Sequence, residues 1–108
     1  MKESVYLLNS AILTAYGNFR YKQMNLQEVK EFLLDKNLIS AIGHESTANV
    51  ISTLLKRDCP VNRITYTQGK SETALIFKLN ERVPEGKILS EKEIEEIGYH
   101  WGKLTREQ

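Results

Sequence analysis

The stretch ETALIFKLN, residues 72–80, is apolar on both faces of a predicted strand. Successive side chains of a strand point to opposite sides, so each face is formed by every second residue. One face carries Leu75, Phe77 and Leu79, and the other carries Ala74 and Ile76. A strand that is apolar on both faces needs cover on both sides, which is typical of a central strand. The fold is therefore expected to be built around residues 72–80.

Three further segments have the composition of strands. VYLL, residues 5–8, is a short apolar run closed by the turn residues Asn9 and Ser10, which predicts a buried first strand. FRYKQM, residues 19–24, alternates in the manner of a half-buried and more exposed strand. VNRITYT, residues 61–67, precedes the central strand, and the loop QGKS between them favours a β-hairpin.

Two helices are indicated by their N-terminal signals. Asn25 is an N-cap residue at the start of NLQEVKEFLLDKN, residues 25–37, whose apolar side chains fall at helical spacing. Ser90 and Glu93 form a capping box, which predicts a helix from about residue 91 to residue 97.

The segment SAIGHESTANVISTLL, residues 40–55, predicts a further helix. Its apolar face is formed by Ala48, Ile51, Leu54 and Leu55. Gly43 and His44 lie at or before the first turn. The N-terminus of this helix is therefore expected next to His44.

The tail GYHWGKLTREQ, residues 98–108, has no periodicity to which an element can be assigned. Tyr99 and Trp101 are large aromatic residues that need cover. Packing on a partner chain would supply that cover.

Strands and helices interleave in a chain of 108 residues, so we expect a single domain, residues 1–108, of the α/β or α+β class. In this fold helices would flank a small mixed β-sheet.

A formal net charge of +1 gives no electrostatic field strong enough to attract long nucleic acid. The single cysteine, Cys59, excludes an internal disulfide and favours the cytoplasm. No segment approaches roughly 18 continuous apolar residues, so no membrane span is expected.

The residues Gly43 to Thr47 form the first candidate site. Free N–H groups and the helix dipole make a helix start an anion site, to which the hydroxyls of Ser46 and Thr47 would add donors. A histidine there has an ordinary pKa of about 6.5 and can donate a proton to a leaving oxygen near neutral pH. The plainer alternative is that Ser46 caps the helix and His44 is a surface or packing residue.

Polar side chains at other positions form the second group of candidates. Arg82 and Glu85 lie in the loop NERVPEG directly after the central strand, where functional residues often occur. Arginine binds phosphate through two parallel donors, and a carboxylate can orient a histidine or a water molecule. Arg63 and Asn9 are further candidates. For Arg82 and Glu85 the alternative is a solvated charged turn. For Arg63 the alternative is that its aliphatic stem simply lies along the sheet.

The sequence lacks the motifs of several common kinds of catalytic and phosphate-binding site. There is no Gly-rich phosphate loop, no metal-ligand spacing and no nucleophile motif. Phosphate chemistry would therefore have to work without a metal or cofactor. RNA permits this, because the ribose 2′-OH can attack its own 3′ phosphate when a general acid protonates the departing 5′ oxygen.

Several of these segments together resemble a known family. They are SAIGHESTANVISTLL, then Asn62 and Arg63, then ERVPEGKILSEKEI from residue 81 to residue 94, and VYLLN near the start. The chain is similar over nearly its whole length to the small viral type III anti-CRISPR ring nucleases. The helix start Ile-Gly-His-x-Ser-Thr and the block Arg-x-x-Glu-Gly-Lys-Ile-Leu are its most specific elements.

The resemblance implies a two-fold homodimer with a mixed sheet flanked by helices. It implies binding of cyclic tetra-adenylate and its metal-free cleavage to linear di-adenylates with 2′,3′-cyclic phosphate ends, which would silence type III CRISPR signalling. It assigns catalysis to His44, as general acid, and to Glu85 beside it. It assigns ligand contacts to Arg63, Arg82, Asn9, Ser46 and Thr47.

The sequence departs from the family pattern at two places. Lys78 stands where the resemblance leads us to expect glutamine, and NSAIL after the first strand lacks a serine at the position where some members contact the ligand. Both departures bear on the adenine contacts more than on cleavage.

Two alternative functions stay open. One is a small viral DNA-binding or regulatory dimer, against which the near-neutral charge argues. The other is a cellular ring nuclease that tempers its own CRISPR response.

Overall fold

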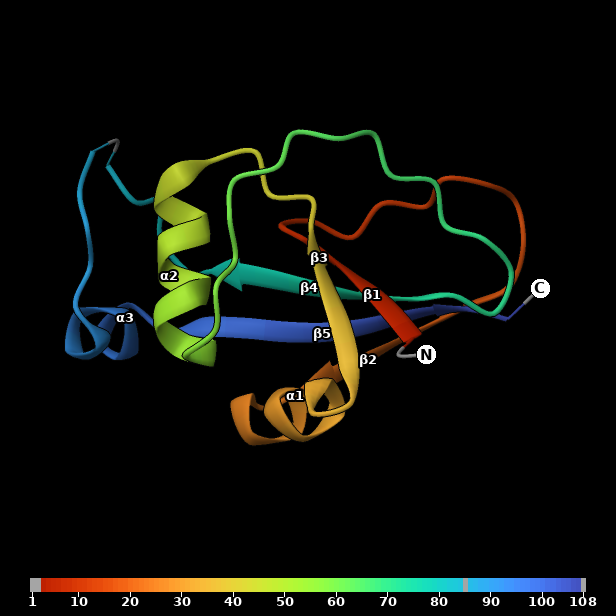
Figure 1. Cartoon of the computed structure of the whole chain (residues 1–108), viewed down its shortest axis with the longest axis horizontal. Helices are drawn as coiled ribbons and strands as arrows, with labels where there is room; N and C mark the ends of the chain where they lie inside the picture. The colour runs from red at the N-terminus through yellow and green to blue at the C-terminus, as the bar shows by residue number, and fades with distance from the viewer. Residues whose placement is uncertain (1–2, 85, 108) are drawn as a thin grey trace.

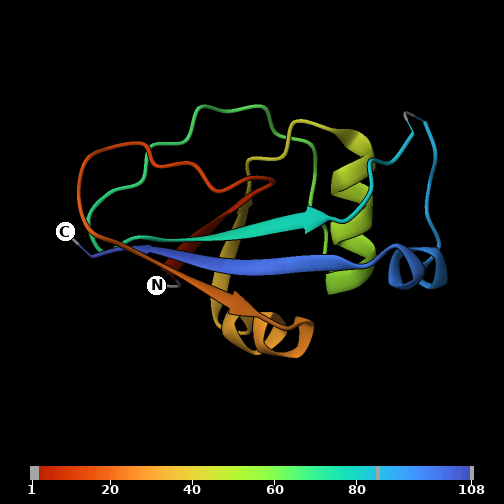
Figure 2. The ribbon, with the colours of Figure 1, turned by 180° about the vertical axis from the view of Figure 1, so that it is seen from behind.

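The computed structural model describes residues 3–84 and 86–107, which form one five-stranded sheet and three helices (Figures 1 and 2). In chain order the elements are β1 (Glu3–Leu8), β2 (Phe19–Met24), α1 (Leu26–Leu33), β3 (Lys36–Ser40), α2 (Glu45–Leu55), β4 (Thr73–Leu79), α3 (Glu91–Ile97) and β5 (Tyr99–Arg106). The predicted single domain with a small mixed sheet flanked by helices is confirmed.

The central strand is β4, as its two apolar faces predicted. The strand order is β2-β5-β4-β1-β3. β1 pairs in parallel with both β3 and β4, whereas β5 pairs antiparallel with β4 and with β2. Because β1, β3 and β4 run in one direction, the chain leaves all three strands at the same edge of the sheet. That edge brings together three loops from distant parts of the sequence.

One face of the sheet and the three helices enclose the main core. Phe77 of β4 and Trp101 of β5 are directly opposite each other, with ring centroids 4.8 Å apart. Val29 of α1, Ile51 of α2 and Ile94 of α3 are buried in the same cluster. The helices therefore bury their apolar stripes against a single sheet face, as their spacing predicted.

The expectation that the tail packs on a partner chain was wrong. Residues 99–106 form β5, and Trp101 is only 2% exposed inside its own chain. Tyr99 is half-buried, with its ring centroid 5.8 Å from that of Phe77. The tail shows no clear alternation of apolar and polar residues for two reasons. β5 lies between two other strands, and position 102 is a glycine, over which the ring of Tyr21 lies.

The predicted hairpin between residues 61–67 and the central strand was also wrong. A strand has only two edges, and those of β4 are taken by β1 and β5. Residues 61–67 instead run as an irregular segment over the second sheet face, where Tyr66 packs beside Ala74 and Ile76. Both views show this segment and residues 9–18 on the side of the sheet away from α1 (Figures 1 and 2).

The helix expected over residues 25–37 ends at Leu33, and the short strand β3 follows it. Arg57 stabilises this junction, since its guanidinium donates to the carbonyl oxygens of Leu33 at 3.0 Å and Lys36 at 2.8 Å.

The predicted helix starts at Asn25 and Ser90 were correct, and both α1 and α3 have complete capping boxes. α2 was also predicted correctly, beginning one residue after His44.

Replacing Trp101 by alanine should lower the free energy of unfolding by about 3–5 kcal/mol, because the lost ring leaves a cavity against Phe77. Urea titration measures the change. The loss should be the same at low and high protein concentration. Leu34→Ala is the control, since Leu34 is 79% exposed and should matter little. A loss that shrinks as protein concentration rises would show that Trp101 is covered by a partner chain instead.

Candidate functional site

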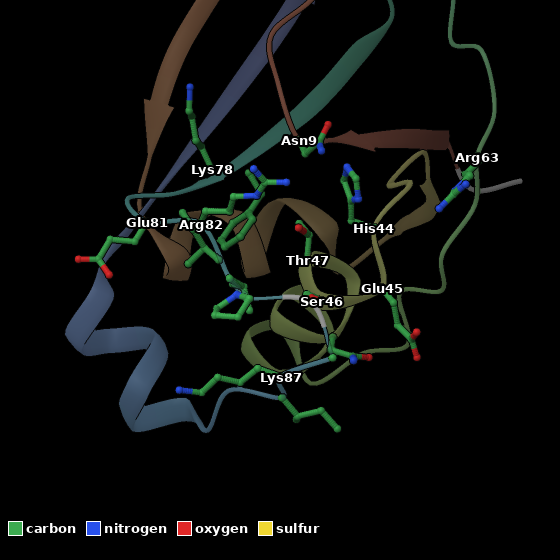
Figure 3. Close-up of a pocket in the computed structure, with 17 residues that line it drawn as sticks. Asn9, His44, Glu45, Ser46, Thr47, Arg63, Lys78, Glu81, Arg82 and Lys87 are labelled. Atoms are coloured by element: carbon green, nitrogen blue, oxygen red, sulfur yellow. The ribbon is translucent and has the colours of Figure 1, made fainter.

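A pocket of about 890 Å³ lies at the edge where the three parallel strands end. Its wall includes six residues predicted from the sequence, namely Asn9, His44, Ser46, Thr47, Arg63 and Arg82 (Figure 3). Asn9 follows β1, His44 follows β3 by way of a short loop, and Arg82 follows β4. The topology therefore assembles the predicted residues at one place. Glu85, the seventh predicted residue, lies outside the described residues.

The start of α2 forms the floor of this pocket and has no side-chain cap. His44 is at the N-cap position with extended backbone angles, and its side chain makes no capping hydrogen bond. Its carbonyl oxygen accepts from the Ala48 N–H at 3.0 Å, which begins the helix. The backbone N–H groups of Glu45, Ser46 and Thr47 have no hydrogen bond to any other described residue. These donors and the positive end of the helix dipole therefore face the pocket unneutralised.

The plainer alternative for Ser46 was wrong. Ser46 is the second residue of the helix, not its cap, and its hydroxyl has no hydrogen-bond partner within the part of the chain that the structure describes. The same is true of the Thr47 hydroxyl. Both hydroxyls are thus free to donate to a group in the pocket.

The loop that carries His44 is fixed by backbone hydrogen bonds to two other segments. The Ala41 N–H donates to the Leu7 carbonyl at 2.9 Å, and the Asn62 N–H donates to the Ile42 carbonyl at 2.9 Å. Ile42 is fully buried and anchors the loop to the core. The position of His44 is therefore set by the sheet and not by the helix alone.

Arg63 fixes the last residue before His44. Its Nε donates to the Gly43 carbonyl oxygen at 2.9 Å, and the arginine side chain passes close over that glycine. A Cβ placed on Gly43 would come within 3.3 Å of the Arg63 Cγ, which is tighter than ordinary packing. A side chain at position 43 would therefore push Arg63 back by a few tenths of an ångström. The remaining guanidinium nitrogens of Arg63 have no hydrogen bond to a described residue and are available to a ligand.

The described part of the pocket wall is positively charged overall. It contains four cationic side chains, Arg63, Lys78, Arg82 and Lys87, against two carboxylates, Glu45 and Glu81. Lys87 is paired with Glu93 at 3.3 Å. Arg82 and Lys78 have no hydrogen bond or ion pair with any described residue. Two exposed cations thus share one pocket with the open start of a helix, which favours an anionic ligand.

Apolar side chains line a second part of the wall. They are Phe77, Leu79, Val83, Pro84 and Ile88. Ile88 is 75% exposed, so it contributes apolar surface to the pocket instead of to the core. A pocket with one cationic and one apolar wall suits a ligand that combines phosphate with a flat, weakly polar group.

The sequence prediction missed several lining residues. Lys78 was noted only as a departure from a family pattern, although a lone cation at the end of a strand that is otherwise buried is a signal of its own. Asn49, Glu81, Lys87 and Ile88 were also missed, and Glu45 lay in the first candidate segment without a role assigned to it. Their positions depend on how α2 and the loop after β4 face each other, which no local pattern reveals.

Outside the pocket, the described residues provide neither a metal-binding cluster nor an exposed thiol. No group of three or more His, Cys, Asp or Glu side chains in residues 3–84 and 86–107 is placed to hold a metal ion. Cys59 is buried outside the pocket, and this burial raises the pKa of its thiol, although a hydrogen bond with Ser40 opposes the effect. No helix in these ranges has the length and apolar character to cross a membrane.

Known proteins with similar sequences span nearly the whole chain. The chain is 36% identical to the YddF protein of Bacillus subtilis (strain 168) over 104 residues, which is 94% of this chain and 96% of YddF. It is 35% identical over 101 residues to protein 26 of Sulfolobus islandicus filamentous virus (isolate Iceland/Hveragerdi), covering 89% and 86% of the two chains. Neither name states an activity.

A solved structure has the same fold. B116 of Sulfolobus turreted icosahedral virus (STIV) matches with a TM-score of 0.82 and 27% sequence identity, covering 94% of this chain and 97% of B116. The family described as STIV B116-like matches residues 5–101, which include most of β1 and all of the described pocket-lining residues. The chain therefore belongs to the STIV B116-like family.

Proposed function

We propose that the protein is a metal-independent ring nuclease that binds cyclic tetra-adenylate and cleaves it to linear di-adenylates with 2′,3′-cyclic phosphate ends. This activity would suppress type III CRISPR signalling by removing its second messenger. The observation that carries the proposal is the position of His44 at the uncapped start of α2, in one pocket with Arg63 and Arg82.

The start of α2 supports binding of the scissile phosphate. The free N–H groups of residues 45–47 would donate to the phosphate oxygens, and the hydroxyls of Ser46 and Thr47 would add two more donors. Arg82 has no partner among the described residues, so its guanidinium can turn towards the same phosphate without breaking an ion pair. Binding would therefore require little rearrangement of the described residues.

The proposed reaction is an internal transesterification of RNA. The ribose 2′-OH attacks the adjacent phosphorus and loses its proton to water, the P–O5′ bond breaks, and the imidazolium of His44 gives a proton to the departing 5′ oxygen. Arg63 and Arg82 would stabilise the negative charge that grows on the phosphorane oxygens. The products carry a 2′,3′-cyclic phosphate and a 5′-OH, and the histidine is recharged from solvent.

The apolar wall supports binding of a nucleobase. Adenine has two flat faces that bury well against aliphatic side chains, and Ile88 and Val83 present such surface beside the cations. An exposed apolar side chain beside the cations gives a nucleobase a surface on which to pack, which an inorganic anion would not need. The combination favours a nucleotide over an inorganic anion.

A homodimer is part of the proposal, because one protomer supplies one His44 and the ring contains a two-fold axis. The segments that cover the second sheet face expose five large apolar side chains: Ile12, Leu13, Tyr16, Val61 and Ile64. Residues 9–18 and 59–69 contain a single charged residue, Arg63. A nearly neutral apolar surface does not repel an identical copy, so a second protomer is the partner that fits it.

The two kinds of relative leave room for two biological roles. A viral copy would silence the response of its host, whereas a cellular copy, in a bacterium for example, would temper its own response. Both roles need the same reaction in the cytoplasm, where the messenger is made. Binding of long nucleic acid is not favoured, because the chain carries a net charge of only +1.

Replacing both Leu13 and Ile64 by glutamate should convert the protein from dimer to monomer, because four buried carboxylates would meet across the two-fold axis. Light scattering at micromolar concentration measures the mass. Leu34→Glu, on the opposite side of the sheet, should leave the dimer intact. A wild-type protein that is monomeric and fully active would contradict the dimer.

Replacing Arg82 by alanine should weaken binding of cyclic tetra-adenylate by about 1–3 kcal/mol, as expected for lost charge-assisted hydrogen bonds. Arg63→Ala should weaken binding similarly and also slow cleavage, because Arg63 positions the loop before His44. Calorimetry and single-turnover assays separate the two effects. Arg20→Ala is the control, since Arg20 lies outside the pocket and pairs with Glu107. Unchanged affinity in both pocket variants would remove the arginines from the site.

Replacing His44 by alanine should slow cleavage by about 10²- to 10⁴-fold, the usual contribution of a general acid, while leaving most of the affinity intact. His100→Ala is a matched control, because His100 is the only other histidine and is exposed outside the pocket. EDTA should not change the wild-type rate, and a ring with 2′-deoxyribose at the scissile positions should bind uncut. Near-wild-type cleavage by His44→Ala would refute the assigned role.

A further inference from the structure

Lys78 is an unusual residue for its position. The four residues before it in β4, Ala74 to Phe77, are buried, yet the Lys78 side chain is exposed and lines the pocket. Because side chains alternate along a strand, Lys78 lies on the opposite sheet face from Phe77, whereas α2 packs on the face of Phe77. Lys78 therefore approaches the pocket from a different side than the start of α2.

The ammonium group of Lys78 forms no ion pair with any carboxylate in residues 3–84 and 86–107. Its cross-strand partner on β5 is His100, which is not an acid. Glu81 lines the same pocket but forms no ion pair with Lys78. Lys87, by contrast, is paired with Glu93, and Arg63 is bonded to a backbone carbonyl. Lys78 thus keeps its full capacity to bind an anion.

The arrangement separates Lys78 from the reacting group. Figure 3 shows the Lys78 side chain directed away from His44, with Arg82 between them in this view. A single phosphate seated on the first turn of α2, beside His44, would therefore not occupy the space beyond Arg82 where the Lys78 ammonium lies. Positive charge at both ends of one pocket suits a ligand with phosphates at separate positions.

We propose that Lys78 forms a second phosphate-binding position in the pocket, for a phosphate that is not cleaved. This inference rests on the proposed function and narrows it, because the pocket then selects ligands that present at least two phosphates at once. A mononucleotide would use only the position at the start of α2. Lys78 contributes to affinity and selection, and takes no part in proton transfer.

The test compares Lys78→Gln with the wild type by calorimetry across a series of salt concentrations. We expect affinity for cyclic tetra-adenylate to fall about tenfold, with a smaller salt dependence because one phosphate contact is lost. KM should rise while kcat stays within about twofold. Binding of AMP should be unchanged, and Lys78→Arg should restore the affinity for the ring. Lys70→Gln is the control, because Lys70 is an exposed lysine outside the pocket.

Each contrary result has a distinct meaning. Unchanged affinity and salt dependence in Lys78→Gln, or an equal loss of AMP binding, would overturn the second phosphate position. A fall in kcat with constant KM would also overturn it, because Lys78 would then act on the reaction itself. If the wild type binds the ring but does not cut it, the proposed cleavage fails while the Lys78 test stands. A wild-type protein that binds neither the ring nor linear tetra-adenylate overturns both proposals.

Discussion

The structure depends on the pairing of β4 along both of its edges. Parallel pairing with β1, which itself pairs in parallel with β3, makes the chain leave three strands at the same edge. Antiparallel pairing with β5 buries Phe77 against Trp101 and closes the main core. The same strand therefore fixes the core and gathers the loops after residues 8, 40 and 79, from which most of the pocket is built. The stability of the core and the geometry of the pocket therefore both depend on the pairing of β4.

Local signals in the sequence were sufficient for much of this fold. Asn25 and Ser90 marked the starts of α1 and α3, because a cap satisfies backbone groups within three residues of itself. The two apolar faces of β4 identified the central strand for a similar reason. The errors concerned pairing. Residues 61–67 alternate like a strand, but the residues that occupy the edges of β4 lie far away in the sequence, and a local pattern contains no information about them.

The candidate site was predictable to a similar extent. His44, Ser46 and Thr47 were found because a helix start is a local feature with a known chemistry. Arg82 and Asn9 were found because they directly follow strands. Lys78 and Ile88 were missed because each is ordinary in its own segment and becomes notable only when α2 and the loop after β4 form opposite walls. Composition could suggest a local phosphate site but not the apolar wall beside it.

The place of β5 in the sheet has a consequence for how the protein is made. No residue of β5 lines the pocket, yet β5 supplies one of the two edges on which β4 depends and the indole that covers Phe77. A nascent chain that has reached only residue 98 already contains every pocket-lining side chain but lacks the strand that holds the central one in place. The pocket should therefore assemble on the ribosome only after residue 106 has emerged, and a chain released earlier would lack the assembled pocket although it carries all the described residues that line it.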